Sequence, residues 1–240
     1  MASPRSKSSI VQFQLLAWCS PAYPTGAFSY SHGMEWAVER GAVTTLAGLL
    51  DFIGAVLERG GGWVDAVLFA HAWRAAGQPP ALWERSARSQ LRELAELAGA
   101  FRATSETALE SRQQGAAFLD VTLKAWPHPR LKEFAGDLRG RPIAQSIAVA
   151  VACAAHGIEL STALQAFVQV IGANLVSAGA RLIPLGQSDA QIAVAHLAPL
   201  VAATADRALA ARLDDLGTSA PALELCSMRH ETQYTRLFRS

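Results

Sequence analysis

Apolar residues recur at intervals of three and four along most of this chain, which is the spacing of one face of an α-helix. Residues 46–57 show it clearly, just after Thr44 and Thr45, either of which can cap a first turn. Three glycines at 60–62 end that helix. Apolar residues at 63–73 predict a second helix, which the Gly-Gln-Pro-Pro sequence at 77–80 closes.

The same spacing continues through the second half of the chain. Between residues 82 and 108 it predicts one amphipathic surface helix, with Arg and Glu on the outer face. Two alanine-rich helices follow, one running to about residue 156 and one over 161–182 that Ser161 would cap. A last long helix is expected over 189–213, capped by Asp189, before a loop at 217–221.

Signals for β-strands are scarce, since alternating Val, Ile and Thr runs bounded by Asn-Gly or Asp-Gly turns are absent. The predicted fold class is all-α, a single-domain helical bundle over residues 1–240 without an interdomain linker. We expect residues 1–9 to be a flexible N-terminus.

Composition narrows the class of protein further. The 240 residues are 51% hydrophobic and 17% charged, enough to bury a substantial core. Because the formal net charge is only +1, we expect neither a nucleic-acid nor an anionic membrane partner. Between Pro142 and Ala180 the only charged residue is Glu159, so this span is expected to form a buried helical centre or a dimer seam.

A membrane or secreted location is not favoured. The uncharged run 160–180 is long enough to span a bilayer, but its Ser, Thr, Gln and Asn side chains fit a buried helix of a soluble protein better. Gln12, Gln14 and two prolines interrupt any signal-peptide core. The three cysteines lie far apart and form no CxxC pair, so the expected location is the cytoplasm.

Catalytic and metal-binding signals are weak. No phosphate-binding loop or dinucleotide fingerprint is present. A hydrolase centred on Ser31 is disfavoured, because Ser29 replaces the first glycine of the GxSxG elbow. Two pairs share helical spacing, His32 with Glu35 and Cys226 with His230, but each pair supplies only two ligands where a metal site usually needs three or four.

Two segments resist a purely structural interpretation. Residues 8–34 carry no formal charge apart from histidine and contain PAYPTGAFSYSHG, in which prolines and glycines fix a particular backbone path. At the other end, CSMRHETQYTRLFRS alternates arginine with aromatic and aliphatic residues. Arginine with aromatics is the composition of interface anchors, so residues 221–240 are expected to be a tail that becomes ordered on a partner.

These segments resemble the urease accessory protein UreF family over nearly the whole chain. The resemblance rests on PAYPTGAFSYSHGMEWAVERG at 21–41, ETALESRQQGAAFL at 106–119, RLIPLGQSDAQ at 181–191 and SMRHETQYTRLFRS at 227–240. Departures are Ala190, where a glycine is common, and the stretch 139–146.

The resemblance implies an all-helical homodimer that is not an enzyme. Such a protein binds a second accessory protein, UreD (also called UreH), and the pair recruits the GTPase UreG to deliver nickel to apo-urease. It implies no cofactor bound tightly by this chain, since nickel and GTP are handled by the complex. The alternative from another class is a metallochaperone that holds nickel directly through His32, Glu35, Cys226 or His230.

The resemblance also implies roles for particular residues. One set would lie near the surface that recruits the GTPase: Tyr30, Ser31, His32 and Glu35. Four others would anchor the C-terminal segment on UreD: Arg236, Leu237, Phe238 and Arg239. Arg229, His230 and Tyr234 in the same segment are further candidate partner-binding residues. Arg236 or Arg239 could instead stabilise phosphoryl transfer in trans, but packing at the interface is the plainer role.

Overall fold

The computed structural model describes the backbone of residues 4–240 and the side chains from residue 9 onward, and within this range all regular structure is helical. This confirms the predicted all-α bundle. In chain order the elements are α1 Pro4–Trp18, η1 Ala27–Ser29, α2 Met34–Glu39, α3 Leu46–Arg59, α4 Gly61–Ala76, α5 Pro80–Leu82, the π-helical turn η2 Trp83–Ala87, α6 Arg88–Ala100, α7 Ser105–Ala125, α8 Pro129–Asp137, α9 Gln145–Ala155, α10 Leu160–Leu182, α11 Gln187–Ala210, η3 Leu213–Asp215 and α12 Pro221–His230.

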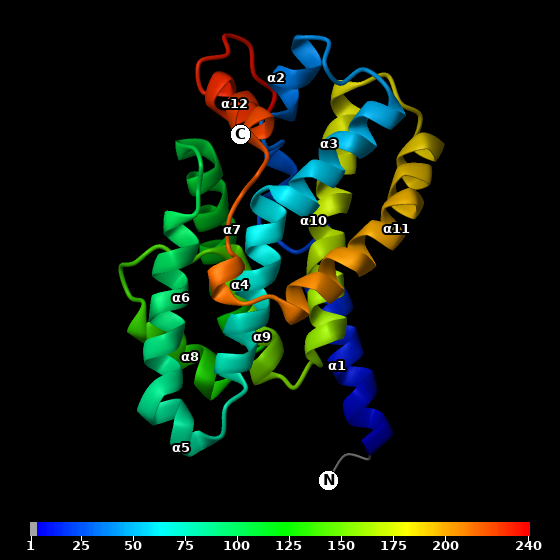
Figure 1. Cartoon of the computed structure of the whole chain (residues 1–240). Coiled ribbons are helices and arrows are strands. Elements are labelled where there is room, and N and C mark those ends of the chain that lie inside the picture. The colour runs from blue at the N-terminus through cyan, green and yellow to red at the C-terminus, as the bar shows by residue number, and fades with distance from the viewer. Residues whose placement is uncertain (1–3) are drawn as a thin grey trace.

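Helix α4 forms the centre of the bundle. It packs against α3, α6, α9, α10 and α11, and most of its side chains are buried (Figure 1). Alanines such as Ala66 and Ala70 let neighbouring helices approach it closely, while Phe69 stacks on Phe167 of α10 with ring centroids 4.9 Å apart. Helix α9 is likewise buried from Ser146 to Cys153, as the charge-free sequence predicts.

Helices α10 and α11 lie side by side along the bundle. Each is long and apolar enough to cross a membrane by length and composition, which is weak evidence because core helices of soluble proteins meet the same test. Half of the most apolar stretch of α10 is buried inside the protein, against α3, α4, α9 and α11. For α11 the buried share is one third, so packing inside the protein accounts for part of the apolar character of the two helices.

The prediction of a single helix between residues 82 and 108 is wrong. Helix α6 ends at Ala100, and a new helix, α7, begins at Ser105. Thr104 makes the break, because its extended backbone and its hydroxyl, which accepts a hydrogen bond from Thr107 N, cap α7. The apolar residues of α6 and α7 continue the same three- and four-residue spacing across the break. Periodicity alone therefore does not show where one helix ends and the next begins.

Two predicted helix caps are also displaced. Helix α10 is capped by Glu159, not by Ser161, and hydrogen bonds from the hydroxyl and backbone N–H of Ser161 and from Thr162 hold the pKa of the Glu159 carboxyl down at about 2. Helix α11 starts after Gly186, and Asp189 sits in its first turn, where it accepts a hydrogen bond from Gly186 N at 3.0 Å. Thr45 does cap α3, as predicted.

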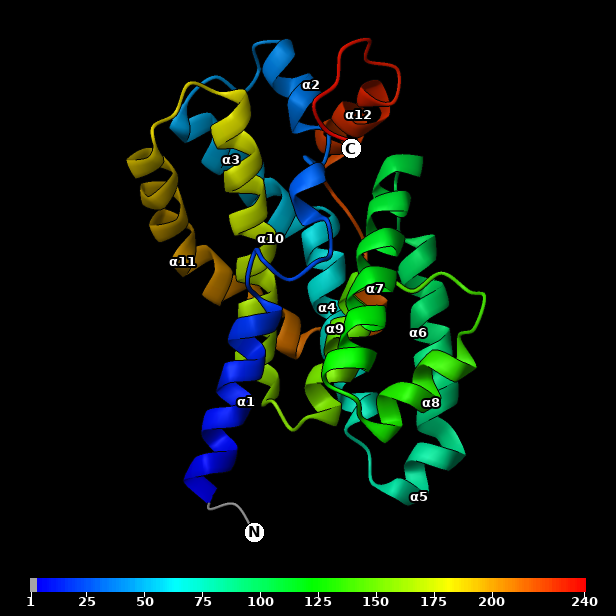
Figure 2. The ribbon, with the colours of Figure 1, turned by 180° about the vertical axis from the view of Figure 1, so that it is seen from behind.

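Helix α1 lies along the outside of the bundle beside α10 (Figure 2). Trp18 at its end is buried with its ring edge-on to Phe118, and Gln14 hydrogen-bonds His156 at 3.1 Å. Residues 1–3 of the N-terminus predicted to be flexible lie outside the described range, and from Pro4 onward the chain is already helical. On the outer face of α1, Ile10, Phe13 and Leu16 are exposed.

Candidate functional site

The two segments that stood out in the sequence lie together at one end of the molecule, where α2 and α12 pack side by side (Figure 1). Backbone hydrogen bonds join them: Arg239 N donates to Ser29 O at 2.8 Å, and Ser31 N donates to Ser240 O at 2.6 Å. The Ser31 hydroxyl donates to the same Ser240 oxygen. Residues 29–32, called here the Tyr30 turn, and residues 221–240, called here the C-terminal segment, therefore form one site.

A buried polar network ties the C-terminal segment to the body. Glu35, on α2, accepts hydrogen bonds from Leu237 N at 2.6 Å and Phe238 N at 2.9 Å. His230 lies between Glu35 and Glu106, with its two ring nitrogens 3.1 Å and 2.7 Å from their carboxylate oxygens. When both carboxylates are ionised, the ring satisfies both only if each nitrogen carries a hydrogen. Arg236 adds an ion pair to Glu106 at 2.7 Å.

A third carboxylate, Glu110, contacts the Tyr30 turn. It accepts hydrogen bonds from Gln114 and from the Ser240 hydroxyl, both at 2.9 Å, and its Oε1 lies 3.0 Å from His32 Nε2. Burial acts to lower the pKa of His32, but the charge and hydrogen bond of Glu110 outweigh it and raise that pKa. His32 also has a left-handed backbone, with φ of 54°, which is uncommon for a residue other than glycine.

The structure does not keep the two expected ligand pairs, and it brings Glu35 and His230 together instead. His32 pairs with Glu110, whereas Glu35 pairs with His230, and both nitrogens of His230 already face carboxylates. Among residues 9–240 no group of three or more His, Cys, Asp or Glu side chains is arranged to hold a metal ion. Direct nickel binding by His32, Glu35, Cys226 or His230 thus has no assembled ligand set to support it.

The proposed partner-binding residues divide into two groups. Tyr30, Ser31, Glu35, His230 and Phe238 are buried, and His32 is partly so. The exposed ones are Arg229, Tyr234, Arg236, Leu237 and Arg239. The C-terminal segment, expected to order on a partner, is here folded onto its own chain.

Glu106 and Glu110 are the site residues that the sequence reasoning missed. They lie four apart on α7, so both carboxylates project from one face toward α2 and the C-terminal segment. The signal was present in the ETALE sequence at 106–110, but the buried partners of these carboxylates are 78 to 130 residues away in the chain.

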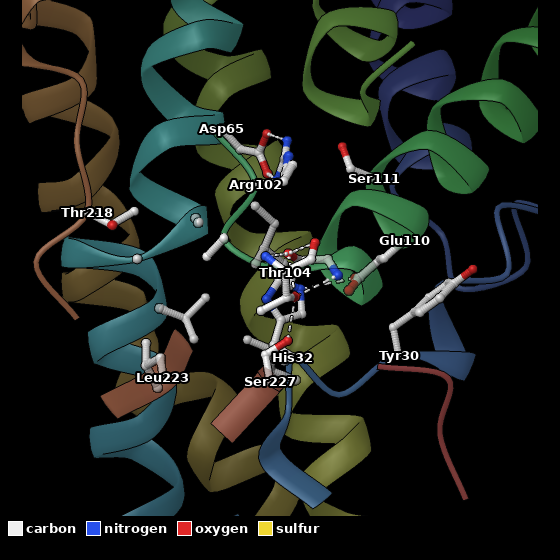
Figure 3. Close-up of a pocket in the computed structure, with 18 of the residues that line it drawn as sticks. Tyr30, His32, Asp65, Arg102, Thr104, Glu110, Ser111, Thr218, Leu223 and Ser227 are labelled. Carbon is white, nitrogen blue, oxygen red and sulfur yellow. Dashed lines mark hydrogen bonds and ion pairs between the residues drawn. The ribbon is translucent and has the colours of Figure 1, made fainter. Parts of the chain in front are cut away.

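Behind this network lies a cavity of about 90 Å³, called here the polar pocket (Figure 3). Asp65 and Arg102 face each other across one side as a bidentate ion pair at 2.5 Å and 3.0 Å. The Ser111 hydroxyl, on a side chain that is only 7% exposed, has no hydrogen-bond partner. Residues close to the C-terminal end of the chain contribute one wall, through Thr218, Ala220, Leu223, Glu224 and Ser227.

Comparison of the sequence with known proteins identifies its family. The UreF family model matches residues 43–198. The chain is similar to the urease accessory protein UreF of Rhodopseudomonas palustris (strain TIE-1), with 48% identity over 235 residues that cover 98% of this chain and 95% of the relative. It is 46% identical to the Granulibacter bethesdensis UreF over 228 residues, 95% of this chain and 93% of that one. The UreF of Bradyrhizobium diazoefficiens is 45% identical over 228 residues, 95% and 91% of the two chains. The chain therefore belongs to the UreF family of urease accessory proteins.

Proposed function

We propose that this protein acts by binding and not by catalysis, as the component of the urease maturation assembly that engages UreD/UreH and recruits the GTPase UreG. Nickel is then the cargo delivered to apo-urease, and GTP is bound and hydrolysed by the GTPase partner. The proposed location is the cytoplasm, where these partners would meet.

The observation that carries this proposal is the outer surface of the C-terminal segment. Tyr234 is fully exposed, Leu237 is 63% exposed, and Leu225 and Met228 are each about half exposed. Arg229 and Arg239 lie among them in the sequence and are also exposed. Exposed aromatic, aliphatic and arginine side chains along one short segment, here α12 and the residues after it, are typical of binding surfaces.

The buried members of the site hold this surface in a fixed conformation. Glu35 binds the backbone of Leu237 and Phe238, and Phe238 is buried beneath the Arg181 guanidinium at 4.4 Å. A preformed surface loses less conformational entropy on binding than a free tail does. We infer that Tyr30, Ser31 and Glu35 serve partner binding indirectly, since their own side chains are buried.

A homodimer is part of the proposal, supported by a different face. The exposed Ile10, Phe13 and Leu16 of α1 lie beside an apolar groove between α10 and α11 with a volume of about 450 Å³, which Leu15 helps to line. A second copy could bury this face. The change Phe13→Glu should shift the protein toward monomer in sedimentation velocity. A protein that is monomeric at micromolar concentration before any change would contradict the dimer.

The docking surface is tested by the change Leu237→Glu. The side chain is exposed, so folding should be unaffected, but a charge at the centre of an apolar contact should reduce retention of UreD roughly tenfold or more. Co-purification of the two proteins measures this, with circular dichroism as the check on folding.

The matched control is Leu82→Glu on α5, another exposed leucine, which lies at the opposite end of the molecule. It should retain UreD as the unchanged protein does. Equal retention by the two variants would rule out the C-terminal segment as the docking surface.

A further inference from the structure

The polar pocket has one wall that belongs to a separable part of the chain. Its other walls come from residues 27–32, the α3–α4 junction, residues 101–114, the start of α9 and α10, all of which lie outside that part. The remaining wall is formed by residues 218–227 (Figure 3). Residues 218–240, called here the lid, thus carry the proposed docking surface outside and a pocket wall inside.

The lid is attached mainly by polar contacts. The Ser227 and Thr104 hydroxyls lie 2.7 Å apart, His230 contacts Glu35 and Glu106, and Arg236 pairs with Glu106. Leu223 and Cys226 pack against the main hydrophobic core but are only partly buried. Phe238 is buried outside that core. A unit held in this way can open without disrupting the bundle.

Two carboxylates join the two halves of the lid: Glu106, which contacts His230 and Arg236, and Glu35. Glu35 Oε2 accepts from Phe238 N and faces His230 Nε2, at the end of α12, while Glu35 Oε1 accepts from Leu237 N. Charge-assisted hydrogen bonds of this kind are about twice as strong as neutral ones. Glu35 therefore acts as a latch that keeps α12 and the following residues in place together.

The connection to the bundle is lightly held. Between η3 and α12, Ser219 N donates to Arg59 O at 2.8 Å, and Gly217 has open space around its Cα. Figure 1 shows this stretch as an extended trace that rises from the turn in front of α4 to α12. It has the form of a hinge.

The pocket side offers a hydrogen-bonding group to what enters it. The Ser111 hydroxyl lines the pocket and has no hydrogen-bond partner within the protein. Water or a small polar solute in the pocket can therefore bond to it.

We propose that residues 218–240 are a hinged lid, latched by Glu35, whose opening admits water and small polar solutes to the polar pocket. The lid itself is independent of any partner. If the docking surface also holds as proposed, a partner bound outside favours the closed lid, and the content of the pocket in turn affects the affinity for that partner.

The experiment uses the full chain alone with Ser111→Cys as a reporter. The rate at which a small thiol reagent labels position 111 is followed by peptide mass, which separates it from Cys19, Cys153 and Cys226. The change Glu35→Gln is then added. Glutamine has one acceptor oxygen where glutamate has two, so the contacts to Leu237 N, Phe238 N and His230 can no longer all be kept. The rate of labelling at position 111 should therefore rise about tenfold or more. The control is Glu96→Gln on α6, which removes an exposed ion pair with Arg141. It should leave the labelling rate unchanged.

Cys153, fully buried in α9, reports global unfolding in the same samples. Faster labelling at position 111 with Cys153 still protected supports the lid. If Glu35→Gln also exposes Cys153, the milder Ser227→Ala decides, since it removes only the contact with Thr104. A rate at position 111 that neither variant raises while Cys153 stays protected overturns the lid and leaves the docking surface, tested through Leu237, untouched.

Discussion

Replacing Gly115 by alanine is expected to lower the free energy of unfolding by about 3 kcal/mol or more. Gly115 lies on α7 where the chain entering α9 crosses it, and an added Cβ would lie 2.1 Å from Ile143 O and 2.8 Å from Gln145 N. These are backbone atoms, so they can move only if α7 and α9 separate. The contact between these two helices is one of the most extensive in the bundle. Urea unfolding followed by circular dichroism measures the change.

Gly99→Ala is the matched control for that experiment. Gly99 is also helical, on α6, but it is exposed and a Cβ there meets nothing within 4 Å. Because alanine has the higher helix propensity, this change should stabilise the protein by up to about 1 kcal/mol. Opposite signs for the two variants are expected. A loss of under about 1 kcal/mol for Gly115→Ala would mean that α7 and α9 are not in close backbone contact.

The second large effect is expected for Gly33→Ala, at the junction of the Tyr30 turn and α2. Gly33 has φ of +75°, and a Cβ would lie 2.5 Å from Ser227 N and 2.7 Å from Cys226 C. The added methyl group should displace α12 from its contact with Gly33. The rate of hydrogen exchange in residues 221–240 should then rise by about tenfold or more, and urease activation in a reconstituted assay should be abolished.

Gly41, just after α2, separates the two causes of that effect. It has nearly the same φ, +74°, but open space where a Cβ would be. Gly41→Ala should therefore cost only the backbone strain, about 1–2 kcal/mol, and leave α12 protected. Similar exchange in residues 221–240 for both variants would show that strain alone, and not contact with α12, governs this region.

Sequence reasoning reached the fold class because helical periodicity is a local property. The spacing over 46–57 and the glycines at 60–62 place α3 and the start of α4 correctly, and Thr45 caps α3 as expected. The corner at Thr104 was missed, since apolar residues on α6 and α7 fall in phase and only the cap geometry marks the break. The local spacing of apolar residues predicts that a helix is present more readily than it predicts where the helix ends.

The site was predictable only in part, for a related reason. The Tyr30 turn and the C-terminal segment each stood out through composition, but their pairing through Ser29, Ser31 and Glu35 depends on contacts about 200 residues apart in the chain. The sequence suggested a free tail because Arg, Tyr and Phe are typical of interfaces. In the structure the same tail contributes Phe238 and Ser240 to its own buried site, and only part of it faces outward.

The burial of Ser240 affects how the protein should be handled. Its backbone oxygen accepts from Ser31, its hydroxyl donates to Glu110, and no part of the residue is exposed to solvent. An affinity tag fused after Ser240 would have to pass through that packing, so it would compete with the Ser31 and Glu110 contacts in every purified sample. A tag is better placed before α1, since the start of that helix at Pro4 lies far from the site in Figure 1.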